Sequence, residues 1–150
     1  MSKYSRWFTI SALLYLLLGA GVGLCMAVYP KSVGILRFSH IHIMMIGWVT
    51  MMIFGLGYHV IPRFCAHSLI SDFWQGFNWW ASNVGLVGMM LFPIIRFYQP
   101  MENTFWTTLF VISGLLQLVG IFIFTVTMLT TLQFKPGFWK MKSCCYECKS

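Results

Sequence analysis

The stretch from residue 36 to residue 64 reads LRFSHIHIMMIGWVTMMIFGLGYHVIPRF, and most of it is apolar enough to lie in lipid. It nevertheless contains three of the four histidines of the chain, His40, His42 and His59. Ionisable side chains inside a membrane-spanning segment are costly, and they commonly mark a functional site. The stretch therefore predicts a membrane helix that carries a site.

The composition of the whole chain supports this interpretation. Of its 150 residues, 59% are hydrophobic and only 9% are charged, whereas charged residues make up about 25% of an ordinary soluble domain. Such a chain indicates an integral membrane protein whose main partner is the lipid bilayer. The net charge of +7 does not indicate a nucleic-acid partner, because the basic residues lie between apolar runs, where they anchor helices and set their orientation.

Four apolar segments are long enough to cross about 30 Å of hydrocarbon at about 1.5 Å per residue. Proline and basic residues end these segments, and the connections are short, so sequential helices should pack as antiparallel neighbours. We therefore expect an all-α, four-helix transmembrane bundle over residues 1–134, followed by a basic, cysteine-rich tail over residues 135–150. The expected spans are 7–29, 40–61, 73–95 and 106–132.

The distribution of Lys and Arg predicts how the bundle is oriented. Seven of these residues fall on the side of the two termini, and three fall on the other side. By the positive-inside rule both termini should be cytoplasmic. His40 and His42 then lie near the outer face of the membrane, and His59 lies near the inner face.

The helical geometry of the second span restricts what its histidines can do. Residues advance by about 100° each, so His40 and His42 point in nearly opposite directions and cannot bind one metal from the same helix. A glycine near a histidine leaves room for a flat macrocycle, and methionine provides a soft apolar wall. Three residues share the face of His40 and a fourth flanks it: Gly47, Met51 and Tyr58, with Met44 beside them.

Two interpretations of these histidines stay open on sequence grounds. An imidazole nitrogen can bind haem iron, or it can form a hydrogen bond to a neighbouring helix while the glycines allow close packing. His59 is the weaker candidate ligand, because it lies at a helix end where its side chain can reach water or headgroups. The polar residues of the third span share one stripe that favours interhelical packing: Gln75, Asn78 and Ser82.

The stretch also resembles the second transmembrane helix of haem-copper oxidase subunit I, and most closely the branch of the C-type cytochrome oxidases and nitric oxide reductases. The resemblance depends on Arg37 three residues before His40, and on Tyr58 and Pro62 at the other end. It implies that His40 binds a low-spin haem b, in a short multi-pass protein of a bacterial inner membrane. The third and fourth spans contain no histidine, so copper is not expected and the chain should not act alone as a complete oxidase.

Haem with two axial ligands needs a second donor, and the sequence leaves its source open. Met26, at a similar depth in the first span, is one candidate. We favour an interfacial site in a homodimer. Either His40 of both chains approaches one iron, or two haems are bound, each by His40 of one chain and His42 of the other. Arg37, one turn from His40, could pair with the haem propionates. Such a site suits electron transfer with a redox partner, or haem-dependent sensing of a gas or redox state.

Two other functions remain possible from the sequence. The chain could be a haem-free accessory or assembly subunit of a respiratory complex. It could also carry a metal on its histidines together with the cysteines of the tail, where Cys144, Cys145 and Cys148 lie close together and His67 is predicted on the same side.

Overall fold

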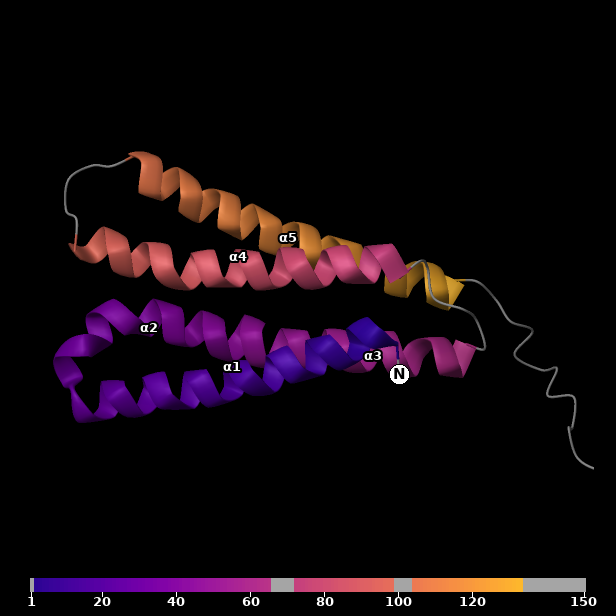
Figure 1. The fold of residues 1–150 in the computed structure, drawn as a ribbon, viewed down its shortest axis with the longest axis horizontal. Coiled ribbons are helices and arrows are strands. Elements are labelled where there is room, and N and C mark those ends of the chain that lie inside the picture. Colours follow the sequence, from indigo (N-terminus) through magenta and orange to yellow (C-terminus); the bar gives the residue numbers. More distant parts are fainter. Residues whose placement is uncertain (1, 66–71, 99–103, 134–150) are drawn as a thin grey trace, which may run out of the picture.

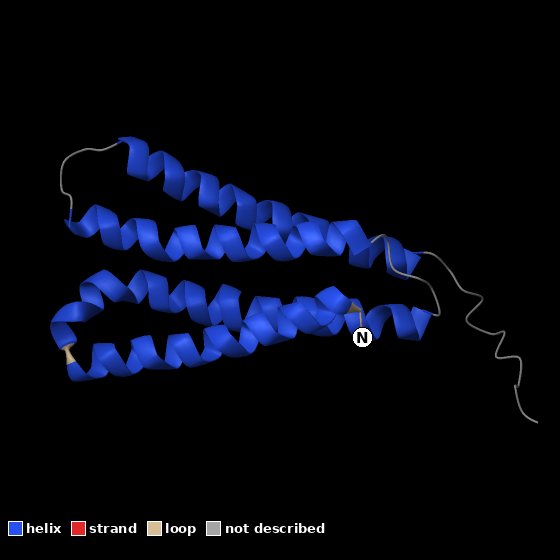
Figure 2. Ribbon diagram, in the orientation of Figure 1, coloured by secondary structure: helices blue, strands red, loops and turns tan. Residues whose placement is uncertain are grey.

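The computed structural model describes residues 2–65, 72–98 and 104–133, and all elements in these ranges are helical. Figures 1 and 2 show long helices connected into two hairpins, with no strand in the described part of the chain. In chain order the elements are α1 (Lys3–Val28), the 3₁₀ turn η1 (Pro30–Ser32), α2 (Val33–His42), the π-helical segment η2 (Ile43–Thr50), α3 (Met51–Cys65), α4 (Asp72–Tyr98) and α5 (Thr104–Gln133).

Four helical stretches are long and apolar enough to cross a membrane: Lys3–Val28, Pro30–Phe64, Asp72–Tyr98 and Thr104–Leu132. They correspond to the four expected spans, and each begins one to ten residues before its expected start. The largest difference is in the second, which begins ten residues before the expected start at residue 40. The all-α class and the four spans are thus confirmed. The cysteine-rich tail and His67 lie outside the described residues.

The ends of the first hairpin follow from local sequence. The Ser2 hydroxyl caps α1 by accepting a hydrogen bond from the Ser5 N–H at 3.2 Å. At the other end, the Tyr29 N–H donates to the Cys25 carbonyl at 2.9 Å, and Pro30 then begins a single 3₁₀ turn. The chain reverses within this turn, so α2 packs back along α1 (Figure 1).

The second long helix is not the uniform α-helix that the sequence pattern assumed. Residues Ile43–Thr50 form a π-helical segment, in which the Met51 N–H donates to the Ile46 carbonyl five residues earlier. The Thr50 hydroxyl donates to the Met45 carbonyl at 2.8 Å, across the same five-residue interval. Such segments widen the helix and change the direction of the residues beyond them. The angles expected between His40 and residues past position 43 therefore do not hold.

Pro62 lies inside α3, and the helix continues to Cys65. The sequence predicts that Pro62 ends the second span, and this prediction is wrong. Proline is tolerated in membrane helices because neighbouring groups satisfy the freed carbonyl. Pro93 likewise lies inside α4.

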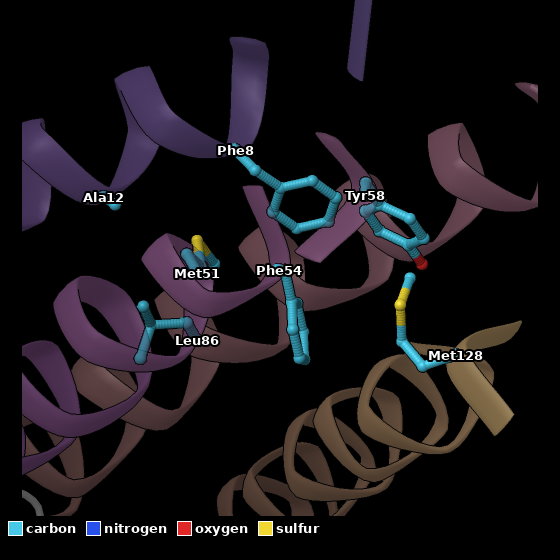
Figure 3. Packing of buried hydrophobic residues seen from close by; sticks show 7 residues of the cluster. All are labelled: Phe8, Ala12, Met51, Phe54, Tyr58, Leu86 and Met128. Carbon is cyan, nitrogen blue, oxygen red and sulfur yellow. The ribbon is translucent and has the colours of Figure 1, made fainter. Parts of the chain in front are cut away.

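The core of the bundle lies between α1, α3, α4 and α5 (Figure 3). The Phe8 ring on α1 packs edge-on against Phe54, with centroids 5.6 Å apart, and Phe54 stacks on Phe124 of α5 at 4.3 Å. The buried hydrophobic cluster comprises Phe8, Ala12, Met51, Phe54, Tyr58, Leu86 and Met128. Most other large apolar side chains face outward, as expected for a protein surrounded by lipid.

The hairpin of α4 and α5 depends on small residues. A Cβ atom on Gly85 would lie 2.8 Å from the Ser113 carbonyl oxygen and 2.9 Å from the Gln117 nitrogen, so the two backbones are in direct contact there. Gly120 of α5 is covered in the same way by Ser82 and Asn78 of α4. This arrangement agrees with the packing role expected for the polar stripe of the third span.

Candidate functional site

His40 lies in the seam between α2 and α1, directly over Gly23. A Cβ atom on Gly23 would lie 3.1 Å from His40 Cε1, 3.7 Å from Nδ1 and 3.8 Å from Nε2. The ring edge that carries both nitrogens therefore faces a position on α1 that has no side chain. His40 Nδ1 is buried and has no hydrogen-bond partner.

An unpaired nitrogen of this kind is rare in the described part of the chain. Only two described side chains have buried polar atoms without a partner, and the other is Gln117 of α5. Burying a polar group without a partner costs about 1–3 kcal/mol in proteins. A carboxamide such as Gln117 is a poor ligand for iron, whereas imidazole is one of the commonest metal ligands. The unpaired group that could act as a metal ligand is thus His40.

The slot beneath His40 is formed by two glycines of α1. Gly19 precedes Gly23 by one turn, and a Cβ atom there would lie 2.5 Å from the sulfur of Met44. His40 and Met44 are also one turn apart, so two side chains of the second helix fit over two glycines of the first. These glycines were not among the residues predicted from the sequence. The signal was present as a Gly-x₃-Gly pair in the first span opposite a His-x₃-Met pair in the second.

His42 has different surroundings from His40. Its Nδ1 lies 2.9 Å from the Phe38 carbonyl oxygen, and its ring stacks on the Phe38 ring with centroids 4.0 Å apart. A carbonyl can only accept, so Nδ1 carries the proton and the lone pair is on Nε2. Metal-binding histidines are commonly held by a hydrogen bond of this kind. The two histidines thus contact different neighbours, Gly23 for His40 and Phe38 for His42.

Most of the residues that were expected to surround a haem beside His40 have other neighbours in the structure. Tyr15 and Leu86 cover Gly47, with atoms 2.8 and 2.9 Å from the position of a Cβ atom. Met51 and Tyr58 belong to the hydrophobic core (Figure 3). Tyr58 is also 18 residues from His40, or about 27 Å along a helix. Of this set, only Met44 shares the seam with His40, and the binding roles of the other three stay predictions.

Arg37 and His59 lie on opposite sides of this region. Arg37 is exposed and one turn before His40, a position from which its guanidinium could meet an anionic group. His59 follows His40 by 19 residues, so it lies about 28 Å away along the helix axis. His59 therefore cannot serve the same site as His40 within one chain.

No group of three or more His, Cys, Asp or Glu side chains comes together within residues 2–65, 72–98 and 104–133. Cys25 of α1 is a free, exposed thiol. A metal in the described part of the chain would therefore depend on one or two protein ligands together with another donor, which is how haem iron is held.

Comparison with known proteins identifies the class of this chain. The family model described as "Cytochrome C and Quinol oxidase polypeptide I" matches residues 3–148. The chain therefore belongs to this family, the haem-copper oxidase subunit I family, as the resemblance of the second span indicated. No curated protein and no solved structure matches the chain.

Membership in this family makes the chain a multi-pass membrane protein of a haem-binding family. The residues around His40 fit that cofactor in two respects. An imidazole with a buried, unpaired nitrogen is a suitable axial donor, and the facing helix has glycine rather than a side chain at the ring edge. A ring propionate would also find the exposed Arg37 one turn away.

Proposed function

We propose that this chain is a b-type haem protein of the membrane that transfers electrons or senses a gas or redox state, without the copper site that oxygen reduction requires. The observation that carries the proposal is the buried, unpaired Nδ1 of His40 over Gly23. Without a ligand this nitrogen would destabilise the bundle, and iron ligation by the imidazole gives the side chain a function. When bound, haem would supply an iron that exchanges one electron or binds a diatomic gas.

Each residue near the proposed site would have a separate role in holding the haem. His40 donates a ring nitrogen, and Gly23 keeps the ring edge free of an opposing side chain. Met44 over Gly19 holds the two helices together one turn deeper. Arg37 supplies a positive charge for a propionate at the end of the site nearest water.

The second axial donor is proposed to come from a second copy of the chain. In this homodimer His42 of one copy and His40 of the other would hold the same haem iron, which would give two equivalent sites. The surroundings of His42 support this assignment, because its Nδ1–H is held by the Phe38 carbonyl and its Nε2 lone pair remains available. Such bis-histidine ligation would favour electron transfer to a redox partner over gas binding.

The distribution of charge supports an orientation with both termini in the cytoplasm of a bacterial cell. The start of α1 and the end of α3 lie at one end of the bundle (Figure 1), and these segments carry Lys3, Arg6 and Arg63. The turn from α1 to α2 and the end of α4 lie at the other end, and they carry Lys31, Arg37 and Arg96. With the additional Lys residues after position 134, the side of the two termini has more Lys and Arg than the other side, which favours a cytoplasmic location for both termini. His40 and His42 would then lie in the outer half of the membrane.

An optical spectrum of the purified protein tests the haem proposal. Protein expressed with ample haem should show a Soret band, and reduction should give the sharp α and β bands of low-spin haem. His40→Ala should lose these bands, whereas His59→Ala, at the opposite end of the same helix, should retain them. Full haem content in His40→Ala would show that His40 is not the ligand. A haem-free wild-type protein would favour an accessory or assembly role.

A complementation experiment tests the shared site. His40→Ala and His42→Ala chains with different tags are co-expressed, and the heterodimer is isolated. One of its two sites then has both histidines and the other has neither, so one low-spin haem per heterodimer is expected. The His42→Ala homodimer is the control, and it should have no low-spin haem. If it keeps low-spin haem, the second donor is not His42, as expected for ligation by His40 and Met26 within one chain.

A further inference from the structure

An open cavity of about 240 Å³ lies at the end of the bundle opposite His40. It is lined by Lys3, Tyr4 and Trp7 of α1 and by Trp79 and Trp80 of α4. Its walls are therefore four aromatic rings, and its single charged group is an ammonium. Neither the haem proposal nor the packing of the core uses this cavity.

The aromatic walls are held in place by their own contacts. The ring centroids of Trp7 and Trp79 are 5.7 Å apart, and those of Trp79 and Trp80 are 4.9 Å apart in an edge-to-face arrangement. The Trp79 indole N–H donates to the Ser11 hydroxyl at 3.1 Å. Tyr4 packs over Gly76, where a Cβ atom would lie 2.7 Å from its ring. The cavity is thus formed before any ligand arrives.

The charge of the cavity is not neutralised within the described part of the chain. Lys3 is exposed, and no ion pair joins it to another described residue. Asp72, at the start of α4, is the single acidic residue in the described ranges, and Arg6 adds a second exposed positive charge one turn after Lys3. The Lys3 ammonium is therefore available to a negatively charged ligand.

The position of the cavity along the bundle indicates what kind of ligand reaches it. The Ser2 hydroxyl donates to Gln75 at 3.0 Å, so the start of α1 lies level with the second turn of α4. Trp, Tyr and Lys at the ends of membrane helices lie at the level of the lipid headgroups. A lipid at this level places its phosphate within reach of an ammonium and its glycerol region against apolar rings.

We propose that this cavity binds the headgroup of an anionic phospholipid, with the phosphate on the Lys3 ammonium and the glycerol region on the indoles of Trp7 and Trp80. Charge complementarity selects an anionic lipid over a zwitterionic one, because the positive headgroup of the latter would meet Lys3 and Arg6. The site is independent of the haem proposal and does not require either orientation of the bundle.

Native mass spectrometry of the full-length protein in detergent tests the site by titration with phosphatidylglycerol, with phosphatidylcholine and with inorganic phosphate. Phosphatidylglycerol should bind first and most tightly. Lys3→Gln should weaken the first binding step about fivefold, the effect of one lysine near a lipid surface, and Lys3→Arg should restore it. Lys31→Gln, which removes an exposed lysine at the other end, should leave binding unchanged.

A second pair of variants separates the cavity from its charge. Trp80→Leu removes one wall, and Trp74→Leu removes an exposed indole of the same helix that does not line this cavity. Only Trp80→Leu should weaken the binding of phosphatidylglycerol. Equal effects within either control pair, equal affinity for phosphatidylcholine, or displacement by inorganic phosphate alone would overturn the proposal.

Discussion

The two halves of the second long helix, α2 and α3, differ in whether their buried polar groups have hydrogen-bond partners. In α3, Tyr58 is 2% exposed, and its hydroxyl accepts a hydrogen bond from Asn78 Nδ2 at 2.9 Å, while Asn78 Oδ1 accepts one from Ser82 at 3.1 Å. In α2, the His40 ring has a buried nitrogen with no partner. Both side chains lie in an apolar helix, but only the first has its hydrogen bonds within the bundle.

This difference separates two reasons for placing a polar group in a membrane helix. A satisfied network such as Tyr58–Asn78–Ser82 joins α3 to α4, and its removal should weaken the fold and leave ligands unaffected. A buried nitrogen without a partner destabilises the fold unless a ligand binds it, so its substitution should affect the ligand rather than weaken the fold. A buried nitrogen without a partner, on a residue type that can bind a metal, is therefore what marks His40 as a candidate site residue.

The largest effect is expected from a substitution on α1 that fills the space facing the His40 ring and leaves the histidine itself unchanged. Gly23→Leu places a side chain where a Cβ atom alone would lie 3.1 Å from the His40 ring. We expect haem content to fall about 10–100-fold, as it does when the support of a ligand is disturbed. The measurement is the Soret absorbance per chain after purification with added haem.

Gly21 provides the matched control for this substitution. It lies on the same helix, and a Cβ atom there would meet nothing within 4 Å. Gly21→Leu makes the same change in helix propensity and hydrophobicity, and it should keep the haem. If both variants lose haem equally, the slot beneath His40 is not the binding site.

The other half of the comparison is tested by Asn78→Ala. This change leaves the buried Tyr58 hydroxyl without the donor on α4, and it should lower the free energy of unfolding by about 1 kcal/mol. The measurement is unfolding of the detergent-solubilised protein by SDS, followed by circular dichroism. The haem spectrum should stay unchanged, so a loss of haem with unaltered stability would reverse the roles of the two regions.

The number and class of the helices followed from the sequence because each span carries a strong, continuous apolar signal. The site was only partly predictable. His40 was selected by its cost in lipid, and its role as a ligand stays a prediction. The expected stripe through Gly47, Met51 and Tyr58 assumed about 100° per residue along a uniform helix. The π-helical segment Ile43–Thr50 breaks that assumption. Five-residue hydrogen bonds leave little trace in hydrophobic periodicity, so no pattern of apolar residues would have revealed it.

Gly23 was missed for a different reason. Its role is visible only once α1 is known to pack against α2 with a particular register, and register depends on contacts between helices rather than on either sequence alone. The short turn at Pro30–Ser32 predicts that the two helices are antiparallel. It does not determine which residue of α1 lies opposite His40. The Gly-x₃-Gly spacing reduces the number of α1 residues that could lie opposite His40, because close approach of two helices needs small residues on one of them.

The smallest effect is expected at His42, which has one ring nitrogen with a hydrogen-bond partner, like Tyr58, and one without, like His40. Its Nδ1 has a partner, the Phe38 carbonyl, but its Nε2 is free for a ligand. Phe38→Leu keeps that carbonyl and removes the ring stacked on the imidazole at 4.0 Å. Loss of such a contact costs about 0.5 kcal/mol. Haem retention in a competition with apomyoglobin should therefore weaken about twofold, with a small shift of the α band.

Phe110→Leu is the control for this variant. It removes the contact between the Phe38 and Phe110 rings, 5.7 Å apart, without altering the stack on His42. It should therefore leave both haem retention and the α band at their wild-type values. A twofold effect from Phe110→Leu as well would mean that packing between α2 and α5, rather than orientation of the His42 ring, controls the site.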